Sequence, residues 1–226
     1  MCGRYNIVTD AQAFYDAYQV EAELGEGRLA RYNVAPATEQ LVIVAEGGHR
    51  AARWHRWGLI PHWAKDPAIA YKAINARGES VAAKPAFRAA FRQRRCLVPA
   101  TGFYEWKVQD GGKQPYLIRP ASGGLISFAG LWETWAGPEG EVRSFTIITT
   151  EPNELMARIH DRMPAIIPRE HYARWLDPAL QDPAQIQPMI GSYPAGELQA
   201  IPVGRQINNA RSQGPQLIEP AGAPLA

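Results

Sequence analysis

The first residues of the chain contain a potential double nucleophile. The sequence begins Met1-Cys2-Gly3-Arg4-Tyr5, and an aminopeptidase that removes Met1 would leave Cys2 with a free α-amine beside its thiol. An α-amine has a pKa of roughly 7.7–8.0 and a thiol one of roughly 8.5, so both are partly deprotonated near neutral pH. With an aldehyde, the amine forms an imine and the thiol closes a five-membered thiazolidine. The pentapeptide alone fits equally well with Cys2 as a small apolar residue that opens a strand.

Three polar residues elsewhere in the chain could assist such a nucleophile. Glu105 lies in an aromatic-rich strand, where partial desolvation would raise its pKa as a general acid or base requires. The plainer interpretation is an exposed glutamate paired with Lys107. His160 follows a predicted helix and could move a proton, although a lone histidine there is more often structural. Asn75 lies in a polar loop, where its amide could hold an amine or an oxygen without titrating.

Composition limits the class of protein. The 226 residues are 46% hydrophobic and 20% charged, which is ordinary for one globular domain. No apolar run reaches the roughly 20 residues that span a bilayer, and the first residues show neither a basic leader nor the apolar core of a signal peptide. We therefore expect a cytoplasmic monomer with no membrane contact. Cys2 and Cys96 are too few for a disulfide framework. The net charge of +2 predicts that any nucleic-acid site is a local groove with few phosphate contacts.

The sequence offers no pattern for a metal or a cofactor. His55 and His62 are seven residues apart on a predicted strand and loop, and no second pair of ligands accompanies them. Neither a phosphate-binding loop nor a dinucleotide fingerprint is present. A set of tryptophans and arginines would suit the stacking of bases and the binding of phosphates, although most tryptophans belong to cores. This set comprises Trp54, Trp57, Trp63, Arg53, Arg56 and Arg77.

Hydrophobic periodicity and turn residues predict the elements. Asp10 is predicted to cap a short helix that places Phe14 and Tyr18 on one face. Further helices are predicted over residues 85–94, from residue 151, and over residues 171–176. Asp110-Gly111-Gly112 is a hairpin signal. Loops are predicted over residues 21–28 and 177–194. Strands are predicted over residues 41–44, 51–59, 96–98, 102–108, 116–118, 125–132, 144–150 and 198–203.

These patterns predict an α+β fold. The strands follow one another without regular βαβ alternation, so we expect a single domain with a strongly curved, barrel-like, mainly antiparallel sheet and a few flanking helices. The domain is predicted to cover residues 1–213. Residues 214–226 form a Pro- and Ala-rich tail, and the end of this tail is predicted to be disordered.

Over almost its whole length the chain resembles the SRAP family, the SOS-response-associated peptidases, also called abasic-site processing proteins. Ser80 and Gly204-Arg205 depart from the family pattern. The matching blocks occur in order: Met1-Cys2-Gly3-Arg4-Tyr5, Arg31-Tyr32-Asn33-Val34-Ala35-Pro36, Trp57-Gly58-Leu59-Ile60-Pro61, Ile74-Asn75-Ala76-Arg77, Arg95-Cys96-Leu97-Val98-Pro99, Gly102-Phe103-Tyr104-Glu105-Trp106, Phe128-Ala129-Gly130-Leu131-Trp132-Glu133, Thr146-Ile147-Ile148-Thr149-Thr150, Ile159-His160-Asp161-Arg162-Met163-Pro164 and Asn208-Asn209.

The resemblance implies a sensor of abasic sites in single-stranded DNA, acting in the DNA damage response. It implies a covalent thiazolidine crosslink through Cys2, a lyase side activity, autoproteolysis and contacts with replication-fork proteins. By position, Cys2 resembles the nucleophile, and Asn75, Glu105 and His160 resemble its catalytic partners. The positions that resemble DNA contacts are Gly3, Arg4, Asn33, Pro36, Trp63, Arg77, Arg162 and Asn208.

Two other functions remain open at this point. Amidotransferases with an N-terminal cysteine also begin with such a sequence, attack an amide with the thiol, and use the α-amine as base. Their glutamine-pocket motifs are not recognisable here, and glutaminase activity would be the discriminating test. A single-stranded DNA binding module without chemistry would keep Arg4, Trp63 and Arg77 in use and make Cys2 dispensable.

Overall fold

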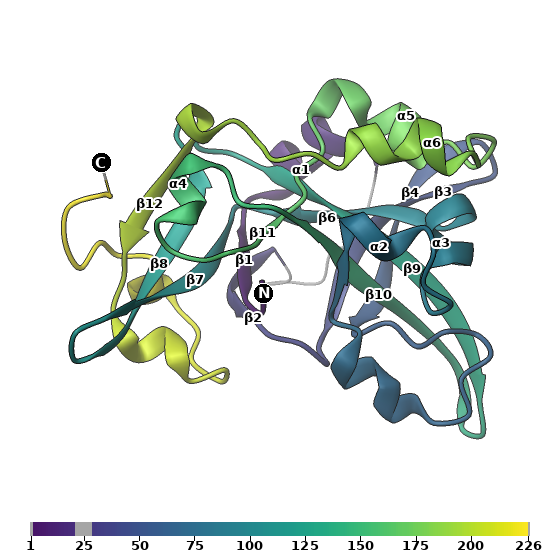
Figure 1. Ribbon diagram of the computed structural model, residues 1–226, viewed down its shortest axis with the longest axis horizontal. Helices are drawn as coiled ribbons and strands as arrows, with labels where there is room; N and C mark the ends of the chain where they lie inside the picture. The colour runs from purple at the N-terminus through teal and green to yellow at the C-terminus, as the bar shows by residue number, and fades with distance from the viewer. Residues whose placement is uncertain (1, 21–28, 226) are drawn as a thin grey trace.

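The structure, a computed structural model, describes residues 2–20 and 29–225. It confirms the predicted α+β class with its barrel-like sheet and few helices. Figure 1 shows β1 near the centre, with β7, β8 and β12 to its left and β9 and β10 to its right. The predicted loop over residues 21–28 lies outside the described residues. Within the described part of the chain, no helix has the length and apolarity needed to cross a bilayer.

Five strands form a closed barrel, because β10 pairs both with β9 beside it in sequence and with β4. All pairings within the ring are antiparallel except β10 with β4. Two short strands, β5 (Asn75–Arg77) and β11 (Met163–Pro164), add to β10 outside the ring. The barrel strands are β3 (Glu39–Glu46), β4 (His49–Trp57), β6 (Arg95–Ala100), β9 (Ile126–Gly137) and β10 (Gly140–Thr150).

A second, five-stranded sheet carries the start of the chain. Its strands are ordered β12-β8-β7-β1-β2, and β7 and β8 form the hairpin that Asp110-Gly111-Gly112 predicts, with φ of +90° at Gly111. The left-handed backbone of such a turn favours glycine. The strands are β1 (Tyr5–Val8), β2 (Ala30–Val34), β7 (Gly102–Gln109), β8 (Gly112–Pro120) and β12 (Leu198–Pro202).

Aromatic side chains join the two sheets. The ring of Tyr5 on β1 lies 5.3 Å from Trp57 of β4 and 5.8 Å from Phe128 of β9. Phe103 of β7 also contacts Phe128, with ring centroids 5.9 Å apart. All four side chains are buried. Burial of such large rings is strongly stabilising, so β1 and β7 are fixed against the barrel.

The helices are short and lie outside the sheets. Asp10 caps α1 as predicted, because its side chain accepts a hydrogen bond from the backbone N–H of Ala13, and α1 buries Phe14 and Tyr18. The predicted helix over residues 85–94 is shorter, since its first residues form turns. The stretch predicted to be irregular contains α6. The helices are α1 (Ala11–Tyr18), α2 (Gly78–Val81), α3 (Arg88–Gln93), α4 (Glu154–Ala157), α5 (Tyr172–Leu176) and α6 (Pro183–Ile186), with 3-10 turns η1 (Pro67–Lys72), η2 (Arg169–His171), η3 (Gln187–Met189), η4 (Ala195–Glu197), η5 (Arg205–Asn208) and η6 (Pro215–Leu217).

The tail packs on the second sheet, so the prediction of a disordered end is wrong for the described residues. Leu217 of η6 is fully buried. The N–H groups of Ala221 and Leu225 donate to the carbonyls of Pro202 and Ala200, both at 2.8 Å. Strand β12 is an edge strand, and the tail covers its open side. The prediction of disorder is based on composition, which does not show that Leu217 can be buried or that the tail can pair with the open edge of β12. The division at residue 213 stays a prediction.

Candidate active site around Cys2

The structure buries Cys2, which lies three residues before the start of β1. Its side chain has no exposed surface, and the Sγ atom lies 3.8 Å from the carbonyl oxygen of Arg4, to which it donates. Burial raises the pKa of the Cys2 thiol well above its ordinary value, and the nearby carboxylate of Glu105 raises it further. The thiol is therefore protonated near neutral pH and needs a base to act as a nucleophile.

Strand register brings Glu105 to Cys2. In the antiparallel pair of β1 and β7, Tyr5 faces Phe103, so the residues before Tyr5 run alongside those after Phe103. Glu105 is 2% exposed, and the alternative of an exposed glutamate paired with Lys107 is wrong. Burial raises the pKa of Glu105 to about 7, with a further contribution from the charge of Asp161. A carboxyl with this pKa can both donate and accept a proton near neutral pH.

His160 faces the carboxyl of Glu105. The residue follows α4, and its Nδ1 accepts a hydrogen bond from the backbone N–H of Arg162 at 3.0 Å. The neutral ring therefore carries its proton on Nε2, which lies 3.9 Å from Oε2 of Glu105. Burial lowers the pKa of His160, so the ring is neutral at pH 7. Oδ1 of Asp161 lies 3.0 Å from Nδ1 of His160, and the two form an ion pair only when the histidine ring is protonated.

Asn75 begins β5 and contributes a buried amide. Both polar atoms of its side chain are buried and have no hydrogen-bond partner among the described residues. An unpartnered buried amide costs stability and calls for a functional explanation. The preceding residue, Ile74, accepts a hydrogen bond from Nε1 of Trp57 at 2.9 Å, and the Trp57 ring packs on Tyr5. Through these contacts the segment of Asn75 is fixed to the strand that follows Cys2.

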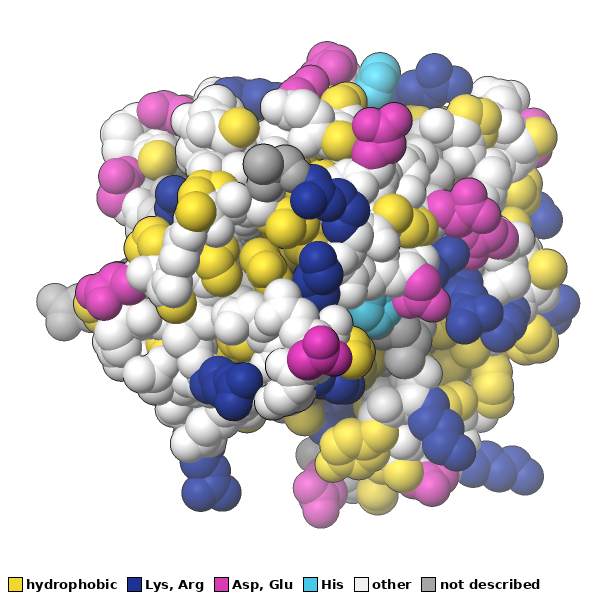
Figure 2. All heavy atoms as spheres, turned by 60° about the vertical axis from the view of Figure 1, so that its left-hand side comes forward, with side chains coloured by type: hydrophobic (Ala, Val, Ile, Leu, Met, Phe, Trp, Pro, Cys, Tyr) yellow, Lys and Arg dark blue, Asp and Glu magenta, His cyan; other side chains and the backbone are white. Residues whose placement is uncertain are grey.

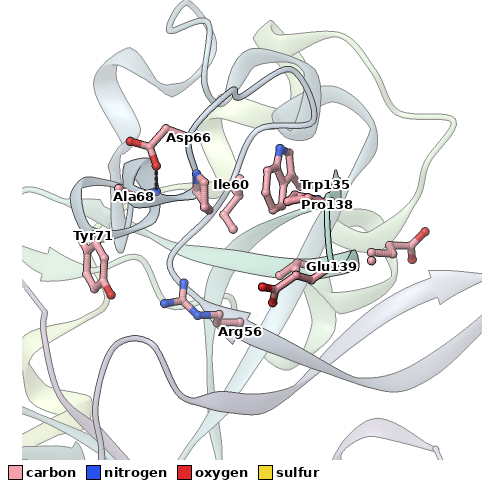
Figure 3. Close-up of a pocket in the computed structure, with 12 residues that line it drawn as sticks. Arg56, Ile60, Asp66, Ala68, Tyr71, Trp135, Pro138 and Glu139 are labelled. Carbon is pink, nitrogen blue, oxygen red and sulfur yellow. Dashed lines mark hydrogen bonds between the residues drawn. The ribbon is translucent and has the colours of Figure 1, made fainter.

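A cavity of about 430 Å³ opens at this site. Its lining includes the two candidate proton carriers, Glu105 and His160, together with Trp106, Lys113 and Asn208. A separate cavity of about 600 Å³, shown in Figure 3, lies between Arg56, Tyr71 and Trp135. It contains none of the candidate catalytic residues. The smaller cavity is therefore the candidate active site.

The predicted DNA contacts differ in exposure. Trp63 is 52% exposed, and Arg77 and Asn208 are also exposed, whereas Gly3, Arg4, Pro36 and Arg162 are half-buried. Figure 2 shows a face on which Lys and Arg side chains form a column beside a recessed histidine. The guanidinium of Arg162 binds both carboxylate oxygens of Glu79, at 2.7 and 3.0 Å. That pair lowers the pKa of Glu79.

Asn33 differs from the other predicted contacts because it is only 1% exposed. Its Oδ1 accepts a hydrogen bond from Nη1 of Arg4 at 2.8 Å. Its Nδ2 donates to the carbonyls of Ile207, Asn209 and Ser212 at 3.4, 3.0 and 3.2 Å. The structure thus places Asn33 where it holds Arg4 and the segment that carries Asn208, rather than on the surface.

Sequence reasoning gave no site role to Trp106, Lys113, Glu79 or Asp161. Trp106 donates from Nε1 to Oδ1 of Asn208 at 2.7 Å, and Lys113 lines the cavity. Trp106 is next to Glu105 in the sequence and could have been found from that neighbour. The place of Lys113 depends on the β7–β8 hairpin and the loops around it. Within residues 2–20 and 29–225, no three His, Cys, Asp or Glu side chains are grouped as metal ligands.

Fold and site together define a class: α+β barrel proteins whose candidate nucleophile is a cysteine at the second position. Comparison with known proteins then gives the family. The family model described as SOS response associated peptidase (SRAP) matches residues 1–210, and the chain belongs to this family.

Relatives and a solved structure extend the match over nearly the whole chain. The abasic site processing protein YoqW of Bacillus subtilis is 42% identical over 222 residues, covering 97% of this chain and 99% of that protein. The abasic site processing protein YedK of Escherichia coli is 31% identical and covers 85% of each chain. A crystal structure of a protein from Bacteroides thetaiotaomicron matches with a TM-score of 0.89 and 26% identity, covering 97% of this chain and all of that one.

Proposed function

We propose that this protein processes abasic sites in DNA, and that it does so by crosslinking itself through Cys2 to the lesion in single-stranded DNA. The observation that carries the proposal is the group of Cys2, Glu105 and His160, in which a buried thiol lies beside a carboxyl with a pKa of about 7. The names of the family's relatives, which are abasic site processing proteins, support the lesion as the substrate.

The nucleophile forms once Met1 is removed, by an aminopeptidase or by the protein itself. The free α-amine of Cys2 then lies on the carbon next to the one bearing the thiol, which suits a 1,2-aminothiol reaction with an aldehyde. An abasic deoxyribose is a hemiacetal in equilibrium with a small fraction of the open-chain aldehyde. The protein must therefore open the sugar as well as trap it.

Glu105 supplies the proton transfers for ring opening, and His160 stabilises the sugar oxygens by hydrogen bonding. The carboxyl of Glu105, with its pKa of about 7, donates its proton to the ring oxygen as the C1′–O4′ bond breaks, and its other oxygen takes the proton of the C1′ hydroxyl. The products are the aldehyde and a hydroxyl at C4′, and Glu105 ends as it began. Nε2–H of the neutral His160 ring keeps its proton and donates a hydrogen bond to the sugar; Nε2 lies 3.9 Å from Oε2 of Glu105, so one sugar can contact both groups.

The covalent steps consume the aldehyde and release one water. The Cys2 amine adds to C1′, and one of its protons passes to the aldehyde oxygen. Glu105 protonates the resulting hydroxyl, which leaves as water, and the nitrogen returns its remaining proton to Glu105 as the imine forms. The thiol sulfur then bonds to C1′ while the imine nitrogen takes the thiol proton, which closes the thiazolidine. The unpartnered amide of Asn75 is suited to orient the amine during both steps.

A lyase side reaction follows from the same intermediate. If a base removes a C2′ proton before the thiol closes the ring, the C3′–O bond breaks and the strand is cut by β-elimination. Glu105, which is buried beside the nucleophile, is the proposed base. Fast closure by the thiol keeps this reaction minor.

Cys2→Ala tests the assignment of the nucleophile. We expect this variant to lose stable crosslinking to single-stranded DNA with one abasic site on a denaturing gel, because the thiazolidine cannot close. Its non-covalent affinity for DNA should remain within about twofold, since the thiol is buried and makes no salt bridge. Cys2→Ser is the matched control and should behave like Cys2→Ala. A crosslink that survives in Cys2→Ala and resists heat would overturn the proposal.

A further inference from the structure

The proposed mechanism gives no role to two cationic residues: Lys113, in the lining of the candidate active site, and Arg205, beside the hairpin that carries Lys113. Lys113, near the start of β8, lines the cavity with Glu105 and His160. Arg205 begins η5 and lies beside the same hairpin: a Cβ added to Gly112 would be 3.8 Å from its Nη2. Since η5 also carries Asn208 of the cavity lining, β8 and η5 together form the rim of the cavity, and both residues lie on these two elements.

Hydrogen bonds fix this rim. Nε2 of Gln114, the residue after Lys113, donates to the carbonyl of Val203 at 3.0 Å. The N–H of Val203 in turn donates to the carbonyl of Pro115 at 3.0 Å. The segment that leads into Arg205 is therefore held on β8. Charges carried by a fixed backbone bind an anion with less loss of conformational entropy than charges on mobile loops.

No carboxylate of residues 2–20 or 29–225 pairs with either charge. The side chains of Lys113 and Arg205 form no hydrogen bond or ion pair with another described residue. The Lys113 ammonium nevertheless acts on the site, because its charge contributes to lowering the pKa of His160. Asp161 is 87% exposed at its side chain and faces the histidine. The rim therefore offers positive charge toward solvent at the entrance to the lesion pocket.

We propose that Lys113 and Arg205 bind a phosphate that flanks the abasic sugar, and that this contact favours lesions within a strand over free aldehydes. The inference rests on the proposed function of the site. A phosphodiester is the anion that necessarily accompanies an abasic sugar in DNA, and Arg and Lys are its usual ligands. The reacting C1′ atom would lie inside the cavity and the phosphate at its rim.

The first test uses a DNA strand that cannot react. Single-stranded DNA with a tetrahydrofuran abasic analogue is compared by fluorescence anisotropy with the same strand carrying a neutral methylphosphonate on the 5′ or the 3′ side of the analogue. For the unmodified protein, one of the two replacements should weaken binding about 5- to 10-fold. Lys113→Ala should bind the phosphodiester strand more weakly by a similar factor, and in this variant the methylphosphonate that weakened binding by the unmodified protein should have no further effect on affinity. If Lys113→Ala and the methylphosphonate weaken binding additively on both the 5′ and the 3′ side, the inference is overturned.

Matched variants separate a local contact from general charge. Arg205→Ala should behave like Lys113→Ala, whereas Lys113→Arg should retain at least about half of the affinity. Arg88→Ala removes one exposed charge on α3, away from the hairpin (Figure 1), and should leave the methylphosphonate effect intact. Loss of that effect in Arg88→Ala as well would show that only net charge matters and would overturn the inference.

The second test separates this inference from the proposed function. Crosslinking rates are measured with abasic single-stranded DNA and with free 2-deoxyribose, which has no phosphate. Arg205→Ala, which changes no residue of the cavity lining, should slow the reaction with DNA about 5- to 10-fold and leave the reaction with deoxyribose unchanged. Equal slowing of both reactions would overturn the inference. No crosslinking by the unmodified protein, together with the expected anisotropy results, would overturn the proposed function alone.

Discussion

Burial of Glu105 has two consequences. It makes the stability of the fold depend on pH, and it gives the carboxyl a pKa suited to proton transfer. Its side chain is 2% exposed, and burial raises its pKa to about 7. Between its ordinary value of 4.5 and about 7, the unfolded chain loses this proton while the folded chain keeps it. Folding then takes up a proton, so the free energy of unfolding falls as pH rises through this window. The same property supplies an acid and a base near neutral pH.

The Glu105→Gln variant should separate these two effects. The amide has the same shape and does not titrate, so the variant should gain about 2–3 kcal/mol relative to the unmodified protein between about pH 4.5 and about pH 8. Crosslinking should slow by about 10²-fold or more because the proton carrier is lost. Urea unfolding at both pH values and gel-based rates check the two results. A stability difference independent of pH, or an unchanged rate, would remove Glu105 from this role.

Strand pairing explains at the scale of elements why the site forms. The register of β1 with β7 places Cys2 near Glu105, and the turn after α4 places His160 opposite. The buried amide of Asn33 then joins β2 to the segment after η5, with a 2.8 Å hydrogen bond from Arg4. Arg4 and Asn208 therefore owe their positions to a residue that does not reach the surface.

Asn33→Ala should destabilise the fold before it affects DNA binding. Removing the amide leaves the buried carbonyls and Arg4 without their partner, at a cost of about 2–4 kcal/mol in the free energy of unfolding. Asn208→Ala, at an exposed position, is the control and should change stability by less than about 1 kcal/mol. Denaturant unfolding measures both. Unchanged stability of Asn33→Ala with lost DNA affinity would instead indicate a direct contact.

Elements with strong local signals could be predicted from the sequence, and their packing could not. The Asp10 cap, the Asp110-Gly111-Gly112 hairpin and the barrel strands are encoded by neighbouring residues. The alternation of side chains along a strand predicted that Glu105 lies on one face together with Phe103 and Lys107. The burial of Glu105 depends on β1, about a hundred residues earlier, so an exposed glutamate remained an alternative. The packing of Leu217 and the place of Lys113 at the cavity are long-range in the same way.

At the scale of the whole molecule, the charge distribution determines what DNA affinity the proposed function predicts. A net charge of +2 gives little long-range attraction, so we expect binding to depend on the arginines near the site. Arg77 is exposed, whereas Arg162 is already paired with Glu79. A strand that binds Arg162 must compete with this carboxylate, which lowers the net gain from the contact. We therefore expect the protein to neutralise only about three DNA phosphates.

The salt dependence of binding measures that number. With about three phosphates neutralised, log K should fall with log salt concentration with a slope of about −2. Arg77→Ala should reduce the magnitude of the slope by about 0.7. Anisotropy titrations with non-reactive single-stranded DNA at several salt concentrations give both values. A slope near zero, or one as steep as about −6, would contradict a local groove.

The intact mass of the covalent adduct tests the central claim most directly. The protein is mixed with single-stranded DNA containing one abasic site, and the product is measured before and after borohydride treatment. The thiazolidine predicts a mass equal to the protein without Met1 plus the DNA minus one water, and no change with borohydride because no imine remains. An adduct that retains Met1, or one that gains two hydrogens on reduction, would contradict closure of the ring by Cys2.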